Sequence, residues 1–147
     1  MSNPRDLRRN LKDVLSTQRF CVLATQGEGQ PYGSLVAFAE TEDLKQLVFA
    51  TSRDTRKFSN LMSEPRVALV IDSRSNGDSD LKNAVAVTAL GLAHEAVGDE
   101  RERLARVYLA KHPGLPGFIG SPEMALCAVA VEDYVVARFT GVTKLKA

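Results

Sequence analysis

The sequence predicts a mainly β protein with short helices, in which roughly six or seven antiparallel strands close into a barrel. Three observations predict this fold class. Short segments rich in Val, Phe, Thr and Ala recur along the chain, as is typical of strands. Tight turns join several of these segments, whereas parallel neighbours would need long crossovers. Long helical segments do not alternate regularly with the strands, which disfavours a doubly wound α/β fold.

The bulk composition indicates a single globular domain over residues 1–147. Hydrophobic residues make up 44% of the chain and charged residues 25%, an ordinary globular balance. The formal net charge of +1 gives no general attraction to nucleic acid or to anionic membranes. Since no apolar run reaches the ~18 residues of a membrane span and the polar N-terminus lacks a signal-peptide core, we expect a cytoplasmic protein.

The first half of the chain is predicted to begin with a helix of about a dozen residues, because Leu7 and Leu11 share a face. Ser2 or Asn3 can cap this helix, and Pro4 suits its first turn. Two tight turns then separate three strands, after which a helix and a fourth strand follow. We expect the strands at 19–25, 32–39, 46–50 and 66–71, and the helix at 55–63.

The second half of the chain begins with a polar, Gly/Ser-rich segment at 72–83, which we expect to be a mobile loop. The remaining predicted elements are a bent strand over 83–97, a charged helix over 99–111, a loop over 112–117 and a closing pair of strands at 126–132 and 134–140.

Cysteine and histidine usage offers little catalytic chemistry. Cys21 and Cys127 lie in apolar runs without a CxxC spacing, so we expect buried thiols in a reducing compartment. His94 and His112 are the only histidines, and neither has a second ligand at metal spacing. No Ser–His–Asp or paired-carboxylate arrangement is evident, which disfavours a hydrolase. Such a lack of acid–base groups is typical of a protein whose bound cofactor carries out the electron transfer.

The most informative segment is 51–57, where a strand runs into hydroxyls and cations just before a helix. Such a helix start directs backbone N–H groups and basic side chains toward one point, which suits a phosphate. No Gly-rich loop is present, so this is not a P-loop. The simplest alternative is a solvated helix start. The cluster is formed by Thr51, Ser52, Arg53, Thr55, Arg56 and Lys57.

Residues 49–57, followed by Asn60-Leu61 and 64–69, resemble the flavin site of the pyridoxamine 5′-phosphate oxidase-like family. In that family an aromatic-Thr pair ends a strand, a Ser/Thr-Arg-Lys triplet opens a helix, and Asn-Pro precedes an apolar strand a few residues later. The chain has Ala50-Thr51, Thr55-Arg56-Lys57 and Glu64-Pro65 in the same order. The resemblance extends from the N-terminal helix to about Glu95, and it implies an antiparallel split β-barrel of the FMN-binding type that is usually a homodimer.

The resemblance also implies roles for individual residues. Arg56 and Lys57 would hold the FMN phosphate, with Thr51 and Thr55 donating hydroxyls and Ala50 preceding them. Thr88 would come from the partner chain, because the flavin of such dimers lies at the subunit interface. The residues expected along the isoalloxazine ring are Ser34, Leu35 and Val36.

Some positions differ from the vitamin-processing members of that family. Gly33 and Phe38 stand where those members have Arg and Lys, and the strand near Ala86 lacks their glutamine. The final third, with 111–113 and 138–141, is more similar to the general flavin-binding and haem-utilisation branches. Oxidation of pyridoxamine phosphate is therefore not expected.

Together these features predict a homodimeric flavoprotein that binds FMN non-covalently and transfers electrons or hydride to a small, unidentified substrate. Two alternatives stay open at the level of sequence. In the first, the chain is a related barrel that binds haem or a deazaflavin instead of FMN. In the second, it is a non-catalytic protein that only binds flavin.

Overall fold

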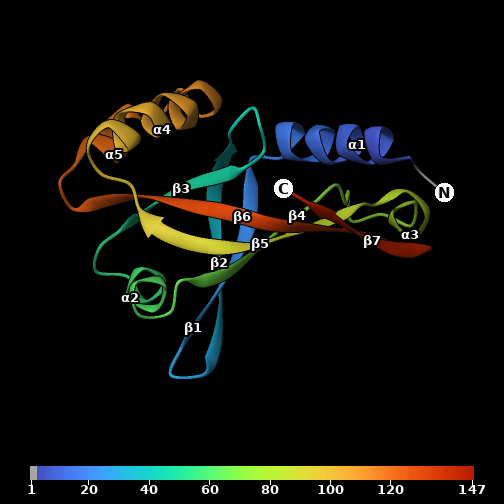
Figure 1. The fold of residues 1–147 in the computed structure, drawn as a ribbon, viewed down its shortest axis with the longest axis horizontal. Coiled ribbons are helices and arrows are strands. Elements are labelled where there is room, and N and C mark those ends of the chain that lie inside the picture. Colours follow the sequence, from blue (N-terminus) through green and yellow to red (C-terminus); the bar gives the residue numbers. More distant parts are fainter. Residues whose placement is uncertain (1–2) are drawn as a thin grey trace.

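The protein is described by a computed structural model that covers residues 3–147. Its seven strands form one antiparallel sheet in the order β3-β2-β1-β4-β5-β6-β7 (Figure 1). A further pairing of β3 with β6 closes all strands but β7 into a barrel, as the sequence predicted. The strands are β1 Phe20–Gly27, β2 Gln30–Glu40, β3 Gln46–Ser52, β4 Arg66–Asp72, β5 Ala86–Glu95, β6 Met124–Arg138 and β7 Gly141–Lys146.

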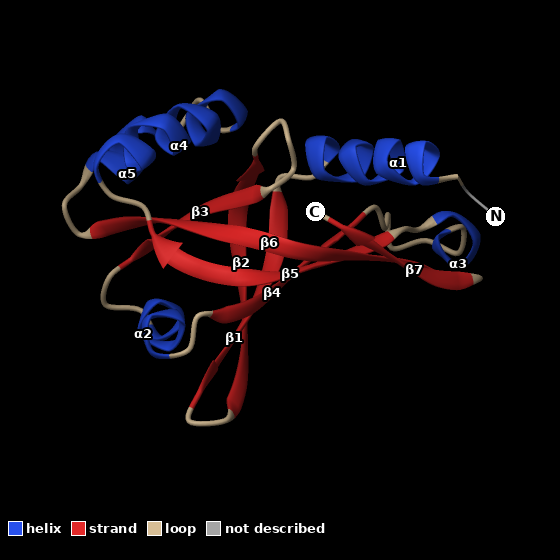
Figure 2. Cartoon of the chain, viewed as in Figure 1, coloured by secondary structure: helices blue, strands red, loops and turns tan. Residues whose placement is uncertain are grey.

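Five short helices surround this barrel (Figure 2). They are α1 Pro4–Thr17, α2 Arg56–Ser63, α3 Asp80–Asn83, α4 Gly98–Lys111 and α5 Pro116–Gly120. The Asn3 side chain caps α1 by accepting a hydrogen bond from the backbone N–H of Asp6 at 3.0 Å. Ser2, the other predicted cap, lies outside the described residues. Within residues 3–147, no helix has the length and apolarity that crossing a bilayer requires.

The buried apolar residues form two clusters rather than one. The first fills the barrel, where Phe38, Phe49 and Leu69 are fully buried, and α1 closes one end of it. The second lies between the outer side of the barrel and α4–α5, and includes Leu104 and Tyr108. Because helices cover this side, β3 and the first half of β6 are buried on both faces. The α4–α5 segment is therefore fixed beside the end of β3.

The predicted pair of strands at 126–132 and 134–140 is wrong. The chain instead forms one continuous strand, β6, of 15 residues, and the last turn comes after Arg138. The charged Glu132 and Asp133 mark a bulge, since Leu90 pairs with Asp133 while Gly91 pairs with Val131. The charged residues at this bulge interrupt the apolar pattern, and the sequence therefore indicated two strands where there is one.

Two predicted loops contain helical turns. The segment 72–83 ends in α3, and the Asp80 carboxylate there accepts hydrogen bonds from the backbone N–H groups of Ser75 and Asn76. The predicted loop over 112–117 runs into α5, which begins at Pro116. The other predicted helices and strands agree with the structure to within a few residues.

Candidate functional site

A cavity of about 390 Å³ lies where β3 leads into α2 and where α4–α5 approaches β2. Its lining includes six of the predicted cofactor residues, which come from β2, β3 and the start of α2. The lining residues are Leu35, Val36, Ala37, Ala50, Thr51, Ser52, Thr55, Lys57, Tyr108, Leu115, Phe118 and Met124. The cavity is apolar apart from the corner at the start of α2.

Two threonine hydroxyls form the polar corner of the cavity. The Oγ1 atoms of Thr51 and Thr55 lie 2.9 Å apart. Thr55 is the N-cap of α2, where its Oγ1 accepts from the Phe58 N–H at 3.3 Å and donates to the Ser52 carbonyl at 2.9 Å. The backbone N–H groups of the first helical turn have no acceptor within the helix. Since the Thr55 hydroxyl donates to Ser52 and the Phe58 N–H is capped, the backbone donors left at this corner are the N–H groups of Arg56 and Lys57.

Two cations follow immediately as the first residues of α2. Lys57 lines the cavity, and the Arg56 guanidinium lies 5.7 Å from the centre of the Tyr32 ring. Within residues 3–147 neither side chain forms an ion pair, and the first turn of α2 has no acidic residue. Cations at a helix N-terminus oppose the helix dipole, so a bound anion would stabilise this arrangement.

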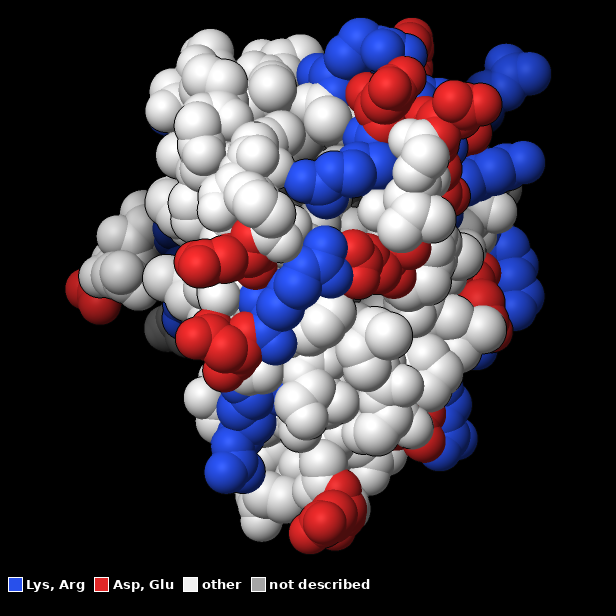
Figure 3. Space-filling view, turned by 90° about the vertical axis from the view of Figure 1, so that its left-hand side faces the viewer, with Lys and Arg blue, Asp and Glu red and all other residues white. Residues whose placement is uncertain are grey.

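This positive charge is local. Figure 3 shows the side of the molecule that carries α2 and the α4–α5 segment. Basic and acidic side chains are interspersed there among large uncharged areas, and neither sign predominates. An anion would thus be attracted by the start of α2 itself rather than by a broad basic surface.

Arg53 does not belong to the anion site, although the sequence placed it in the same basic cluster. Its two guanidinium Nη atoms lie 2.6 Å from the two Oε atoms of Glu95, and its Nε donates to the Pro122 carbonyl at 3.2 Å. This bidentate pair lowers the pKa of Glu95 below its ordinary value. Arg53 is therefore committed to a contact between β3, β5 and the chain after α5.

Three predicted site residues do not line the cavity. Arg56 adjoins it at the first position of α2, and Ser34 lies half-buried on β2 next to Leu35. Thr88 lies on the outer face of β5 and pairs with Val70 of β4. Val70 pairs with Val22 of β1, which in turn pairs with Leu35 of β2. Three strand spacings of ~4.8 Å separate Thr88 from Leu35, or ~14 Å. Thr88 is thus remote from the cavity of its own chain.

The sequence reasoning missed the wall that the α4–α5 segment contributes. Tyr108 of α4 lines this cavity, and that contact was not predicted. Leu115, Phe118 and Met124 had no recognisable signal, because nothing local indicates that the chain after α4 returns to β2 and β3.

The histidine side chains have polar partners in the structure, and the cysteine side chains are buried. His94 Nε2 lies 2.7 Å from Glu100 Oε1, and the buried His112 Nε2 lies 2.7 Å from the Phe38 carbonyl. Both cysteines are buried, and burial raises the pKa of each thiol to about 12. No group of three or more metal-ligating side chains is present among residues 3–147.

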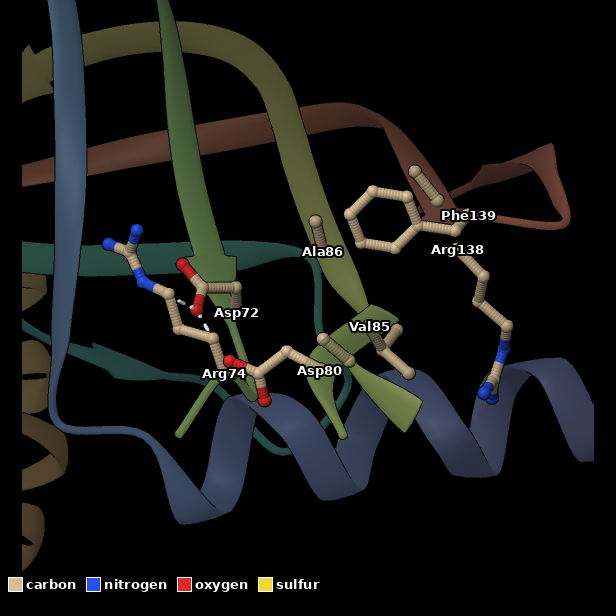
Figure 4. Close-up of a pocket in the computed structure, with 9 residues that line it drawn as sticks. Asp72, Arg74, Asp80, Val85, Ala86, Arg138 and Phe139 are labelled. Atoms are coloured by element: carbon tan, nitrogen blue, oxygen red, sulfur yellow. Dashed lines mark hydrogen bonds and ion pairs between the residues drawn. The ribbon is translucent and has the colours of Figure 1, made fainter. Parts of the chain in front are cut away.

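A second hollow, of about 480 Å³, lies beside the ends of β4 and β6. Figure 4 shows Arg74 and Asp72 on one side of it and Phe139 with Arg138 on the other. Arg74 pairs with Asp72 at 3.1 Å, so one of the two arginines is already neutralised. The hollow contains none of the predicted cofactor residues and mixes both signs of charge. It is a poorer anion site than the start of α2.

Solved structures share this fold. A haem-binding protein from Mycobacterium smegmatis matches with a TM-score of 0.81 and 20% identity over 90% of this chain, which spans only 55% of the mycobacterial chain. A FAD-binding protein from Mesorhizobium loti matches with a TM-score of 0.65 and 21% identity, covering 86% of this chain and 89% of that one.

A protein from Clostridium acetobutylicum related to general stress protein 26, of the pyridoxinephosphate oxidase family, matches with a TM-score of 0.75 and 14% identity. This match covers 98% of the present chain and 96% of the clostridial one. No curated protein sequence matches the chain. The family model described as pyridoxamine 5′-phosphate oxidase matches residues 7–135. Since that match spans most of the sequence, the chain belongs to the pyridoxamine 5′-phosphate oxidase family.

Proposed function

We propose that this chain binds FMN non-covalently and acts as an oxidoreductase toward a small substrate. The observation that carries the proposal is the polar corner at the start of α2. There the paired hydroxyls of Thr51 and Thr55 and the cation Lys57 line the end of an otherwise apolar cavity, and Arg56 adjoins them at the first position of α2. A phosphate joined to a planar ring system has the same division between a charged and an apolar part.

The residues present fit such a group. Hydroxyls, cations and free backbone N–H groups are the donors that phosphate dianions prefer. Leu35, Val36 and Ala50 offer apolar surface of the kind that binds a flat ring, and the described lining contains no carboxylate to repel an anion. A volume of about 390 Å³ lies within the usual range of ~300–1,000 Å³ for small-molecule sites.

When bound, the flavin would supply the hydride or electron transfer, which needs no nucleophile from the protein. The protein's part is to bind the phosphate, orient the ring and exclude water from one of its faces. Tyr108 contributes to that enclosure, and its burial raises the pKa of its hydroxyl, so it stays neutral in the physiological range.

A second copy of the chain would complete the site. The outer face of β1, β2, β4 and β5 leaves large apolar side chains uncovered, with Leu35 72% exposed and Phe20 58% exposed. Thr88 lies on this same face, in line with Leu35. In a two-fold dimer built through this face, Thr88 of the partner subunit would approach the ring, as the family resemblance implies.

Haem is the principal alternative, because one structural neighbour is a haem-binding protein. The contacts of the histidines favour the flavin. Since the Nε2 atoms of His94 and His112 both have a partner at 2.7 Å, ligation of haem iron through either atom would first break that contact. Visible absorption of the purified protein distinguishes flavin, deazaflavin and haem. Anaerobic reduction by a nicotinamide, followed by reoxidation, distinguishes an oxidoreductase from a passive flavin binder.

The decisive test removes both cations of the polar corner. We expect Arg56→Ala with Lys57→Ala to weaken FMN binding by ~3–6 kcal/mol, on the order of 10²- to 10⁴-fold, because each charge-assisted hydrogen bond contributes ~1.5–3 kcal/mol. Titration calorimetry measures the affinity. The matched control is Arg9→Ala with Lys82→Ala, which removes two exposed cations from α1 and α3. Equal affinity in the two double variants, both folded, would reject the site.

A further inference from the structure

The segment that follows α4 forms one wall of the cavity but has little structure of its own. It contributes Leu115 and Phe118, and it leads into Met124 at the start of β6. Within it, α5 has only five residues and no side-chain cap, and its buried anchor is Ile119. A helix this short is not stable by itself, so contacts from elsewhere must hold the wall in place.

Two arginines from different elements bind the backbone of this segment. The Arg53 N–H donates to the Glu123 carbonyl at 3.0 Å, and Arg53 Nε donates to the Pro122 carbonyl at 3.2 Å. Arg101, in the first half of α4, donates through Nη2 to the Ile119 carbonyl at 2.7 Å. Guanidinium groups thus bind the chain at Ile119 and Pro122, and the Arg53 backbone N–H binds it at Glu123.

Glu95, at the end of β5, orients the first of these arginines. Its carboxylate holds both Nη atoms of Arg53 at 2.6 Å, which leaves Nε directed at the Pro122 carbonyl. Only 19% of the Glu95 side chain is exposed. Arg53 is the main cause of the lowered pKa of Glu95, and the charge of Arg101 lowers it further. The Glu95 carboxylate therefore pairs directly with Arg53, and the second arginine that binds the same segment contributes only its charge.

We propose that Arg53, Glu95 and Arg101 are positioning residues that hold the segment 115–123 as a preformed wall of the cavity and thereby slow the release of bound FMN. The first half of this proposal, the preformed wall, depends only on contacts within the chain. The second half rests on the proposed function. None of the three side chains lines the cavity, so they act through Leu115, Phe118 and Met124.

The test uses Glu95→Gln, which keeps the size of the side chain but removes the charge that holds Arg53. Hydrogen exchange of the full-length, cofactor-free protein measures the wall directly. We expect exchange of the amides in 115–123 to rise on the order of 10- to 100-fold, the effect of losing one charged hydrogen-bonded pair. The matched control is Glu64→Gln, which breaks another bidentate pair, with Arg66, away from this segment.

The second measurement is the rate at which FMN leaves, followed by recovery of flavin fluorescence after dilution. We expect Glu95→Gln to accelerate release by a similar factor, Arg53→Lys to do so in part, and Glu64→Gln to leave the rate unchanged. Unchanged exchange in 115–123 would overturn the positioning role. Raised exchange with an unchanged release rate would overturn the link to the cofactor. If the wild-type protein does not bind FMN at all, the proposed function fails, and the exchange measurement still decides whether these residues hold the wall.

Discussion

At the residue scale, burial rather than reactivity explains both cysteines. Cys21 is 2% exposed and Cys127 fully buried, and burial raises the pKa of each thiol from its ordinary value of 9.0 to about 12. The thiols of the unfolded chain ionise at a lower pH than those of the folded protein. The neutral thiols therefore contribute their full share of the free energy of unfolding below pH ~9, and this share falls as the pH rises toward ~12.

We therefore expect both thiols of the native protein to resist a disulfide reagent such as Ellman's at pH 8. Both should react once the chain is unfolded in guanidinium chloride. The count of released thiolate measures this directly. Rapid reaction of either cysteine in the native protein would contradict the burial described here.

Single residues also show how far the sequence could predict the site. Thr51, Thr55 and Lys57 line one cavity, and the sequence could group them because strand, cap and helix start are local features that adjacent residues specify. The sequence grouped Arg53 with Arg56 and Lys57 for the same reason, because it lies in the same basic segment. Its partner Glu95 is 42 residues away, and no local pattern distinguishes an arginine that binds an anion from one that is already paired.

At the scale of the element, the bulge between β5 and β6 depends on Gly91. A Cβ atom placed there would lie 2.2 Å from the Ala130 carbonyl oxygen, which belongs to the backbone and cannot move aside easily. We expect Gly91→Ala to destabilise the protein by ~1–3 kcal/mol through overpacking. Chemical denaturation followed by circular dichroism measures the change.

Gly33→Ala is the matched control for that substitution. A Cβ at Gly33, on β2, meets only a Val22 methyl group at 3.7 Å, an ordinary contact distance. We expect this variant to change stability by well under the effect of Gly91→Ala. Similar free energies of unfolding for the two variants would show that the close approach at Gly91 relaxes without cost.

The elements that the sequence missed share one physical cause. Glu132 and Asp133 interrupt an apolar pattern, so they indicated a turn, yet pairing with β5 and β7 on both sides keeps β6 continuous through the bulge. Likewise α5 has no capping side chain of its own; Arg101 of α4 binds its Ile119 carbonyl, and Arg53 binds the chain just after it. Local propensity predicted the elements that stabilise themselves, and tertiary contacts decided the others.

At the scale of the whole molecule, the cavity is built from parts that are distant in sequence. The barrel brings β2 beside β3, and the second apolar cluster holds α4–α5 over the same end. The phosphate end of the predicted site is thus local, while its apolar wall depends on the complete fold. The outer face of β1, β2, β4 and β5 remains uncovered within one chain, and this leads to the last prediction.

Val22 lies in the middle of that face, between Leu35 and Val70, and is 36% exposed. If two copies pack through this face, Val22→Glu places a charge in an apolar interface, where it has no partner and costs several kcal/mol to bury. We expect the wild-type protein to have the mass of two chains in analytical ultracentrifugation, and the variant that of one.

The control for this variant is Leu81→Glu, which adds the same charge at a residue of α3 that is 62% exposed and outside the face. It should leave the dimer intact. We also expect Val22→Glu to lose FMN affinity although Val22 does not line the cavity, because the partner subunit's contribution to the site would be lost with the dimer. A wild-type protein that sediments as a single chain at micromolar concentration, yet binds FMN tightly, would show that one chain alone forms the complete site.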